Sequence, residues 1–98
     1  MAEKSTDFLT PIVVGANHRS STMALRDQLF VEDSMAPAFL SELKALDMTN
    51  AMVLSTCDRV EVHGLHASPD VAERVVRQSF AQHSGAPEEE LREQFYLL

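Results

Sequence analysis

The sequence predicts an α+β fold, in which a four-stranded antiparallel sheet carries helices on one face. Two observations lead to this prediction. Short runs rich in β-branched or aromatic residues recur along the chain, and amphipathic helical segments follow the first run and the third. The resulting order is strand, helix, strand, strand, helix, strand. This order is typical of a split βαβ arrangement, so the expected architecture is ferredoxin-like.

The composition is typical of one small globular domain. The chain has 98 residues, of which 45% are hydrophobic, so it can bury a single core. No stretch approaches the roughly 20 apolar residues of a membrane span, and the charged N-terminus lacks the apolar centre of a signal peptide. One cysteine cannot build a disulfide framework, which agrees with a reducing compartment. We therefore expect a cytoplasmic protein with no membrane association.

The net charge argues against nucleic-acid binding over a large surface. The formal charge is −7 at pH 7, whereas contacts to phosphates need lysine or arginine. The basic residues are Lys4, Arg19, Arg26, Lys44, Arg59, Arg74, Arg77 and Arg92. Any contact with RNA would therefore depend on a local group of these few cations.

The first half of the chain predicts one strand and two helical segments. Residues 1–10 are expected to form a flexible lead-in, and residues 11–98 to form the domain. The β-branched run from Ile12 to Val14 predicts the first strand. A loop follows, and a serine or threonine at its end is suited to cap a helix. Apolar residues at helical spacing are Met23, Leu25, Leu29 and Phe30 in the first segment, and Phe39, Leu40, Leu43 and Leu46 in the second.

The second half begins with a pair of strands and a long helix. Apolar runs from Ala51 to Leu54 and from Val60 to Leu65 predict the strands. Ser68 followed by proline is a typical helix start, and Gly85 suits the end of that helix.

The long helix is predicted to be amphipathic and to be followed by a final strand. Its apolar side is expected to carry Val71, Val75, Val76 and Phe80, and its outward side Glu73, Arg74, Arg77 and Gln78. Acidic residues 88–90 then begin a short helix or turn, and residues 95–98 form the last strand.

The single cysteine, Cys57, lies in the polar interruption between the two central strands and is the candidate nucleophile. A thiol at a strand end is partly exposed on a rigid support, and the guanidinium of Arg59 favours the nucleophilic thiolate. Arg59 also carries a planar fork that can bind a carboxylate. A lone cysteine is most often a small buried apolar residue, but the polar neighbours Thr56 and Asp58 argue against that role here.

Each neighbour of Cys57 also has a purely structural interpretation. Arg59 can form a surface ion pair with Glu61 or Asp58. The Thr56 side chain and the Asp58 backbone can bind a substrate near its carbonyl group, or they can satisfy amides within the turn. His63 and a histidine three residues later do not complete a ligand set, so no metal site is predicted.

Two motifs resemble a known enzyme family. The string Ser55-Thr56-Cys57-Asp58-Arg59-Val60-Glu61 is similar to the Ser-Thr-Cys-Asn-Arg-Thr-Glu motif of glutamyl-tRNA reductase. The segment from Val14 to Asp27 resembles the Gly-x-Asn-His-Lys-Thr-Ala-Pro-x-x-x-Arg-Glu signature of the same family. Both motifs occur in the order of the family and at a similar spacing.

The resemblance implies a catalytic role for Cys57. In the family, the corresponding cysteine attacks the ester of glutamyl-tRNA and forms a thioester, which NADPH reduces to glutamate-1-semialdehyde for tetrapyrrole (porphyrin and haem) biosynthesis. It implies that Arg59 binds the glutamyl carboxylate and that Thr56, Cys57, Asp58, Asn17 and His18 contribute to substrate binding. Asn17 and His18 can equally brace their loop. Asp58 departs from the asparagine of the family, and its negative charge opposes thiolate formation.

The resemblance also implies which parts of the enzyme lie elsewhere. Residues 11–98 correspond to the N-terminal catalytic domain, and the NADPH-binding and dimerisation domains are expected to be absent from this chain, which has no Gly-x-Gly-x-x-Gly fingerprint. The implied partners are glutamyl-tRNA as substrate, the downstream glutamate-1-semialdehyde aminotransferase, and a second copy in a homodimer. The alternative is a small ferredoxin-like regulatory or binding module with an idle cysteine motif.

Overall fold

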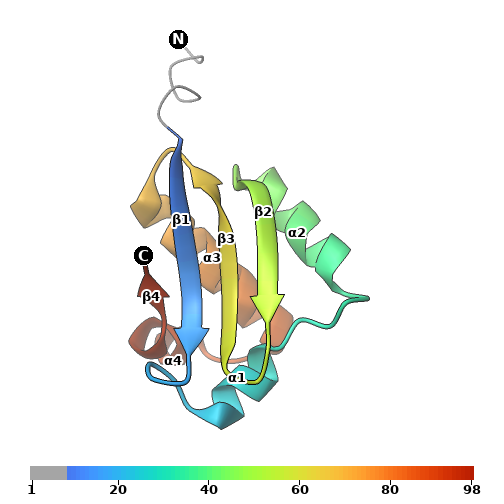
Figure 1. Cartoon of the computed structure of the whole chain (residues 1–98), viewed down its shortest axis with the longest axis vertical. Helices are drawn as coiled ribbons and strands as arrows, with labels where there is room; N and C mark the ends of the chain where they lie inside the picture. Colours follow the sequence, from blue (N-terminus) through green and yellow to red (C-terminus); the bar gives the residue numbers. More distant parts are fainter. Residues whose placement is uncertain (1–8) are drawn as a thin grey trace.

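The computed structural model describes residues 9–98, and most of the predicted lead-in lies outside the described residues (Figure 1). Strand β1 begins at Thr10, one residue before the predicted start of the domain. The elements are β1 (Thr10–Asn17), α1 (Met23–Leu29), α2 (Ala36–Ala45), β2 (Thr49–Ser55), β3 (Arg59–His66), α3 (Pro69–Ser84), α4 (Glu88–Gln94) and β4 (Tyr96–Leu97). Within residues 9–98, no helix combines the length and apolar character needed to cross a bilayer.

The four strands form one antiparallel sheet in the order β2-β3-β1-β4. Helices α2 and α3 lie behind this sheet, and none of the helices in residues 9–98 covers its other face (Figure 1). The predicted α+β fold with a four-stranded antiparallel sheet is therefore confirmed. Strands β2 and β3 extend one or two residues beyond the predicted runs at each end, because strand pairing continues past the apolar residues.

The core lies between the sheet and the helices. Alternate residues of β1 and β3 point toward the helices and are buried: Ile12, Val14, Ala16, Val60 and Val62. Phe80 of α3 is fully buried and contacts Phe39 of α2 and Phe95, with ring centroids 4.8 Å and 5.6 Å away. Burial of each of the larger side chains, such as Val14 and Phe80, contributes about 1.5–3 kcal/mol. The core therefore fixes the sheet against α2 and α3.

The helix ends follow the predicted capping residues. The Thr22 hydroxyl accepts a hydrogen bond from the Leu25 N–H at 3.1 Å, and the Ser68 hydroxyl accepts one from the Val71 N–H at 3.4 Å. Gly85 ends α3 with φ of 79°, the left-handed conformation that glycine adopts without strain. Local sequence signals therefore set where these helices begin and end.

Arg77 corrects one prediction for α3. It was expected to point outward, but only 7% of it is exposed. Its Nη1 lies 3.2 Å from a carboxylate oxygen of Glu73, and its Nε lies 3.6 Å from one of Glu88 at the start of α4. Helix α4 packs over this side of α3 and covers Arg77. The spacing of residues within α3 could not predict this, because it carries no information about which other helix packs there.

Gly15 allows β1 and β3 to approach closely. It lies opposite Glu61 of β3 and Tyr96 of β4. A Cβ atom at this position would lie 2.2 Å from the Val60 carbonyl oxygen and 2.7 Å from the Glu61 Cα, and 2.9 Å from the Glu61 Cγ. The absent side chain also leaves the space in which Glu61 and Tyr96 meet over β1.

We expect Gly15→Ala to lower the free energy of unfolding by about 1–3 kcal/mol, because the added methyl group must displace backbone atoms. Urea unfolding followed by circular dichroism measures this loss. Gly64→Ala is the matched control, since its Cβ would lie 2.9 Å from the terminal methyl group of Met48 and 3.3 Å from the Ala51 Cα, farther from any backbone atom than at Gly15, and should cost less. Equal losses for the two variants would contradict the steric explanation.

Candidate active site

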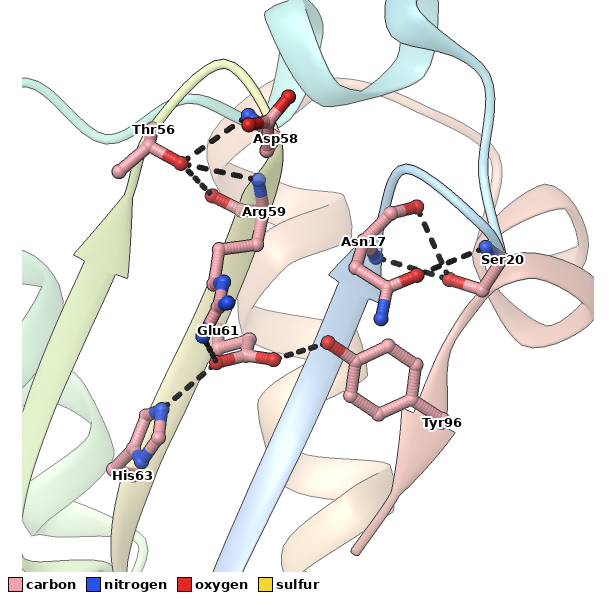
Figure 2. Close-up of polar contacts among 8 residues, drawn as sticks. All are labelled: Asn17, Ser20, Thr56, Asp58, Arg59, Glu61, His63 and Tyr96. Carbon is pink, nitrogen blue, oxygen red and sulfur yellow. Dashed lines mark hydrogen bonds and ion pairs between the residues drawn. The ribbon is translucent and has the colours of Figure 1, made fainter.

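Cys57 lies in the turn that joins β2 to β3, and it is exposed. Thr56 closes this turn. Its backbone N–H donates to the Arg59 carbonyl oxygen at 2.8 Å, and its Oγ1 accepts from the N–H groups of Asp58 and Arg59, both at 3.2 Å (Figure 2). Thr56 and the Asp58 backbone therefore satisfy each other's hydrogen bonds within the turn, as their structural interpretation predicts. The turn holds its backbone closed and leaves the thiol accessible.

The loop after β1 lies at the same end of the sheet as the cysteine turn. Asn17 pairs with Arg59 in the β1–β3 register, so the two sequence motifs lie at the same end of the sheet. The Asn17 Oδ1 accepts hydrogen bonds from the N–H groups of Arg19 and Ser20 at 2.9 Å and 3.0 Å. Asn17 thus stabilises its own loop, which is the structural one of the two roles considered for it, the other being substrate binding. His18 is exposed in this loop, and no hydrogen bond or ion pair within residues 9–98 joins it to the cysteine turn.

Arg26 of α1 connects the loop to the cysteine turn. Its Nε donates to the Cys57 carbonyl oxygen at 3.0 Å. Its Nη1 donates to the carbonyl oxygen and hydroxyl of Ser21 at 2.8 Å and 3.0 Å, and to the Asn17 carbonyl oxygen at 3.3 Å. Only 5% of Arg26 is exposed. Arg26 lies within the first sequence motif and was otherwise counted only among the cations of the chain, although its place between Leu25 and Leu29, which are both buried, was a signal of burial.

The helix-free face of the sheet carries a polar cluster centred on Glu61. Alternation along β3 places Arg59, Glu61 and His63 on this face. Nη1 of Arg59 lies 3.8 Å from Oε1 of Glu61, and Nε2 of His63 lies 2.9 Å from the same oxygen. The Tyr96 hydroxyl donates to the second carboxylate oxygen, Oε2 (Figure 2). Glu61 is only 5% exposed, so its neighbours cover it although the sheet face has no helix.

The Arg59 side chain turns toward Glu61 and remains half exposed. Figure 2 shows it running back along β3 from the cysteine turn toward the Glu61 carboxylate. The side chain is 53% exposed, and its single ion pair is longer than a hydrogen bond. The predicted ion pair with Glu61 therefore exists, and about half of the Arg59 side chain stays accessible to solvent. Glu61 was predicted only as a partner in this pair, and Tyr96 only as part of the last strand.

The contacts of Glu61 stabilise its negative charge. Burial alone would raise the pKa of the Glu61 carboxyl group, but hydrogen bonds with Tyr96 and His63 and the charges of His63 and Arg59 outweigh it, so the pKa is lowered from 4.5. For Tyr96, burial and then the hydrogen bond to Glu61 and its charge raise the pKa of the phenol, whereas Asn17 and Arg59 oppose the rise. Glu61 is therefore an anion and Tyr96 a neutral donor at neutral pH.

The two histidines of β3 do not share a site. Residues three apart on a strand point to opposite faces. His63 contacts Glu61, whereas His66 is buried and its Nδ1 accepts a hydrogen bond from the Ser68 N–H at 2.9 Å. In the part of the chain that the structure describes, no three or more His, Cys, Asp or Glu side chains are grouped to hold a metal ion.

Fold and site together define a class of domain: a ferredoxin-like α+β unit with an exposed cysteine turn beside an arginine–carboxylate cluster. Residues 14–98 match the family model described as Glutamyl-tRNAGlu reductase, N-terminal domain. The chain belongs to this family, which confirms the resemblance of the two sequence motifs.

Similar proteins agree with this assignment. The chain is 47% identical over 58 residues to a glutamyl-tRNA reductase of Rhodospirillum rubrum, covering 59% of this chain and 14% of that protein. It is 35% identical over 86 residues to one of Chloroherpeton thalassium and 30% identical over 87 residues to one of Synechococcus elongatus, covering 87% and 88% of this chain. The chain spans 20% of the length of each of these two relatives.

Ionisation of Glu61 is expected to stabilise the fold in a pH-dependent way. Because the folded-state pKa lies below 4.5, this contribution is complete above 4.5 and is lost as the pH falls through the folded-state pKa. Glu61→Gln should cost about 1–3 kcal/mol at neutral pH, and the difference from the parent chain should shrink in acid. Urea unfolding at a series of pH values measures it.

Tyr96→Phe is the informative companion variant. It removes the hydrogen bond that lowers the Glu61 pKa, so its stability should depend less steeply on pH below 4.5 than that of the parent chain. If the stability of the parent chain and that of Glu61→Gln fell equally as the pH drops below 4.5, the lowered pKa of Glu61 would be contradicted.

Proposed function

We propose that this domain is the acyl-transfer part of a glutamyl-tRNA reductase, in which Cys57 takes the glutamyl group from glutamyl-tRNA as a thioester. The observation that carries the proposal is the exposed thiol in a closed turn, with Arg59 two residues away, in a chain whose relatives are named glutamyl-tRNA reductase. Accessibility and a fixed backbone are what a nucleophilic cysteine requires.

The proposed step exchanges an ester for a thioester. The Cys57 thiolate attacks the glutamyl carbonyl carbon, so that an S–C bond forms and the bond from that carbon to the ribose oxygen breaks. The proton lost by the thiol balances the proton taken up by the ribose hydroxyl. The thioester keeps its carbonyl activated for a later step, which is the general advantage of covalent catalysis.

Arg59 is the proposed binding group for the glutamyl side-chain carboxylate. Its guanidinium is half exposed, and its ion pair with Glu61 at 3.8 Å uses one nitrogen. Glu61 is held by Tyr96 and His63, so it steadies the guanidinium from one side and leaves the other donors for a carboxylate. Around this contact, Thr56, Asp58, Asn17 and His18 are proposed to form the rest of the substrate-binding surface, mostly by keeping the turn and loop in shape.

The proposal limits this domain to the glutamyl end of the substrate. Contacts along RNA need exposed cations, and the net charge is −7. Two of the few basic residues, Arg26 and Arg77, are buried and bonded within the domain. Recognition of the RNA itself is therefore assigned to other surfaces of the enzyme.

The residues of this domain do not fit NADPH. A dinucleotide site needs a glycine-rich turn between a strand and the start of a helix. Here Gly15 and Gly64 lie within strands and Gly85 follows the end of α3. The acyl transfer proposed for this domain therefore does not involve NADPH. The NADPH-dependent reduction to glutamate-1-semialdehyde for tetrapyrrole biosynthesis is proposed to occur elsewhere in a cytoplasmic, homodimeric enzyme, with the aminotransferase as the next partner.

A second candidate function is a regulatory or binding module with an idle cysteine. Two observations favour it: Arg59 already contacts Glu61, and Asp58, the residue that follows Cys57 in the sequence, replaces the asparagine of the family motif with a carboxylate. The two candidates differ in whether Cys57 accepts a glutamyl group, so one experiment separates them.

Incubation of the chain with glutamyl-tRNA should produce a covalent glutamyl adduct on Cys57. Intact-protein mass spectrometry after an acid quench detects the adduct, and hydroxylamine should release it, as expected for a thioester. Cys57→Ser is the control and should show no hydroxylamine-sensitive adduct at neutral pH. A parent chain that stays unmodified while the RNA remains charged would favour the idle module.

Arg59→Lys should raise the glutamyl-tRNA concentration for half-maximal acylation by about tenfold, because a lysine replaces a two-pronged contact with a point charge. Rates of adduct formation over a substrate series measure it. Arg74→Lys, an exposed position on the outer side of α3, is the matched control. An equal shift in both variants would contradict the proposed carboxylate contact.

A further inference from the structure

We infer that Arg26 is a positioning residue for Cys57, holding the cysteine turn against the loop after β1. This inference rests on the proposed acyl transfer at Cys57 and assigns a role to a side chain that does not itself touch the reacting atoms. The contacts that carry it run from one buried guanidinium to both sequence motifs.

The guanidinium of Arg26 donates hydrogen bonds to two segments, the cysteine turn and the loop after β1. Nε donates to the Cys57 carbonyl oxygen at 3.0 Å. Nη1 donates toward the other segment, where the Ser21 carbonyl oxygen and hydroxyl lie at 2.8 Å and 3.0 Å and the Asn17 carbonyl oxygen at 3.3 Å. The planar fork of an arginine fixes the angle between these two directions. One rigid group therefore joins the cysteine turn to the loop, in addition to the β1–β3 pairing that brings them to the same end of the sheet.

Among residues 9–98, no carboxylate forms an ion pair with Arg26. Its hydrogen bonds within residues 9–98 all end on carbonyl or hydroxyl oxygens. The other buried arginine, Arg77, contacts the carboxylates of Glu73 and Glu88. A buried cation without an anionic partner is costly, and its positive field remains directed at the cysteine turn, where it favours negative charge that develops during a reaction. Arg77 has no comparable relation to the turn, so it is a suitable control.

The remaining contacts of the turn complete its support. Thr56 closes it from the side of the solvent through hydrogen bonds with the Asp58 and Arg59 N–H groups. The Val31 N–H, just after α1, donates to the Ser55 hydroxyl at the end of β2 at 2.9 Å. Cys57 is thus held by its backbone on the inner side while its thiol stays exposed. Fixing the nucleophile before the substrate arrives removes part of the entropic barrier to attack.

The test compares Arg26→Lys with Arg77→Lys in the whole chain. A lysine keeps the positive charge but cannot donate in two fixed directions. Single-turnover acylation by glutamyl-tRNA should slow about 10–100-fold at saturating substrate in Arg26→Lys, with the half-saturating concentration changed by less than about twofold. Arg77→Lys should keep the rate within about twofold, although it also loses buried contacts. A merely structural loss in Arg26→Lys would reduce the active fraction and leave the rate constant of the folded chain unchanged.

A second measurement does not depend on the substrate. Amide hydrogen exchange in a peptide that covers residues 55–59 should be about tenfold faster in Arg26→Lys and unchanged in Arg77→Lys. If Arg26→Lys does not fold, Ser21→Ala serves instead, since it removes one hydroxyl contact of Arg26 and should give a smaller change of the same kind.

The outcomes distinguish the inference from the proposed function. A parent chain that is not acylated overturns the proposed function, and the exchange measurement then decides the role of Arg26. A normal acylation rate in Arg26→Lys, an equal loss in Arg77→Lys, or unchanged exchange at the cysteine turn would each overturn the inference.

Discussion

The antiparallel pairing of β1 with β3 is the constraint on which the site depends. It places Asn17 opposite Arg59 and so brings two motifs that are far apart in the sequence to one end of the sheet. Neither motif could form the arrangement alone, because the loop supplies the acceptors for Arg26 and the turn supplies the thiol. Packing of the buried faces of β1 and β3 on α3 maintains this pairing. The arrangement around Cys57 thus depends on core packing between the sheet and α3, which does not itself contact the thiol.

The order of the elements could be predicted because its signals are local. Alternating apolar residues define β3, Thr22 and Ser68 mark helix starts, and Gly85 marks a helix end. The exposed position of the cysteine also followed from its polar neighbours. Strand ends were less well predicted, since hydrogen bonding between strands extends into residues whose side chains are polar, such as Arg59.

Contacts between distant segments account for what the sequence could not reveal. Arg26 and Arg77 are polar residues whose burial depends on elements that pack over them: the cysteine turn in one case, and α4 in the other. Glu61 occupies a strand position that alternates with buried valines, so it is expected on the surface. Tyr96 reaches it from β4 and, with His63, covers it. Such residues can be found only once the strand order β2-β3-β1-β4 is known.

The glycine in the middle of β1 has a consequence for folding fidelity. An antiparallel pair shifted by two residues keeps the same side chains on each face, so alternation alone does not exclude it. Such a slip would move Val13 or Asn17 into the place opposite Glu61, where even a methyl group has no room in the native spacing. Gly15 therefore favours the native register of β1 and β3, because registers shifted by two residues are destabilised by a steric clash and would also separate the two motifs.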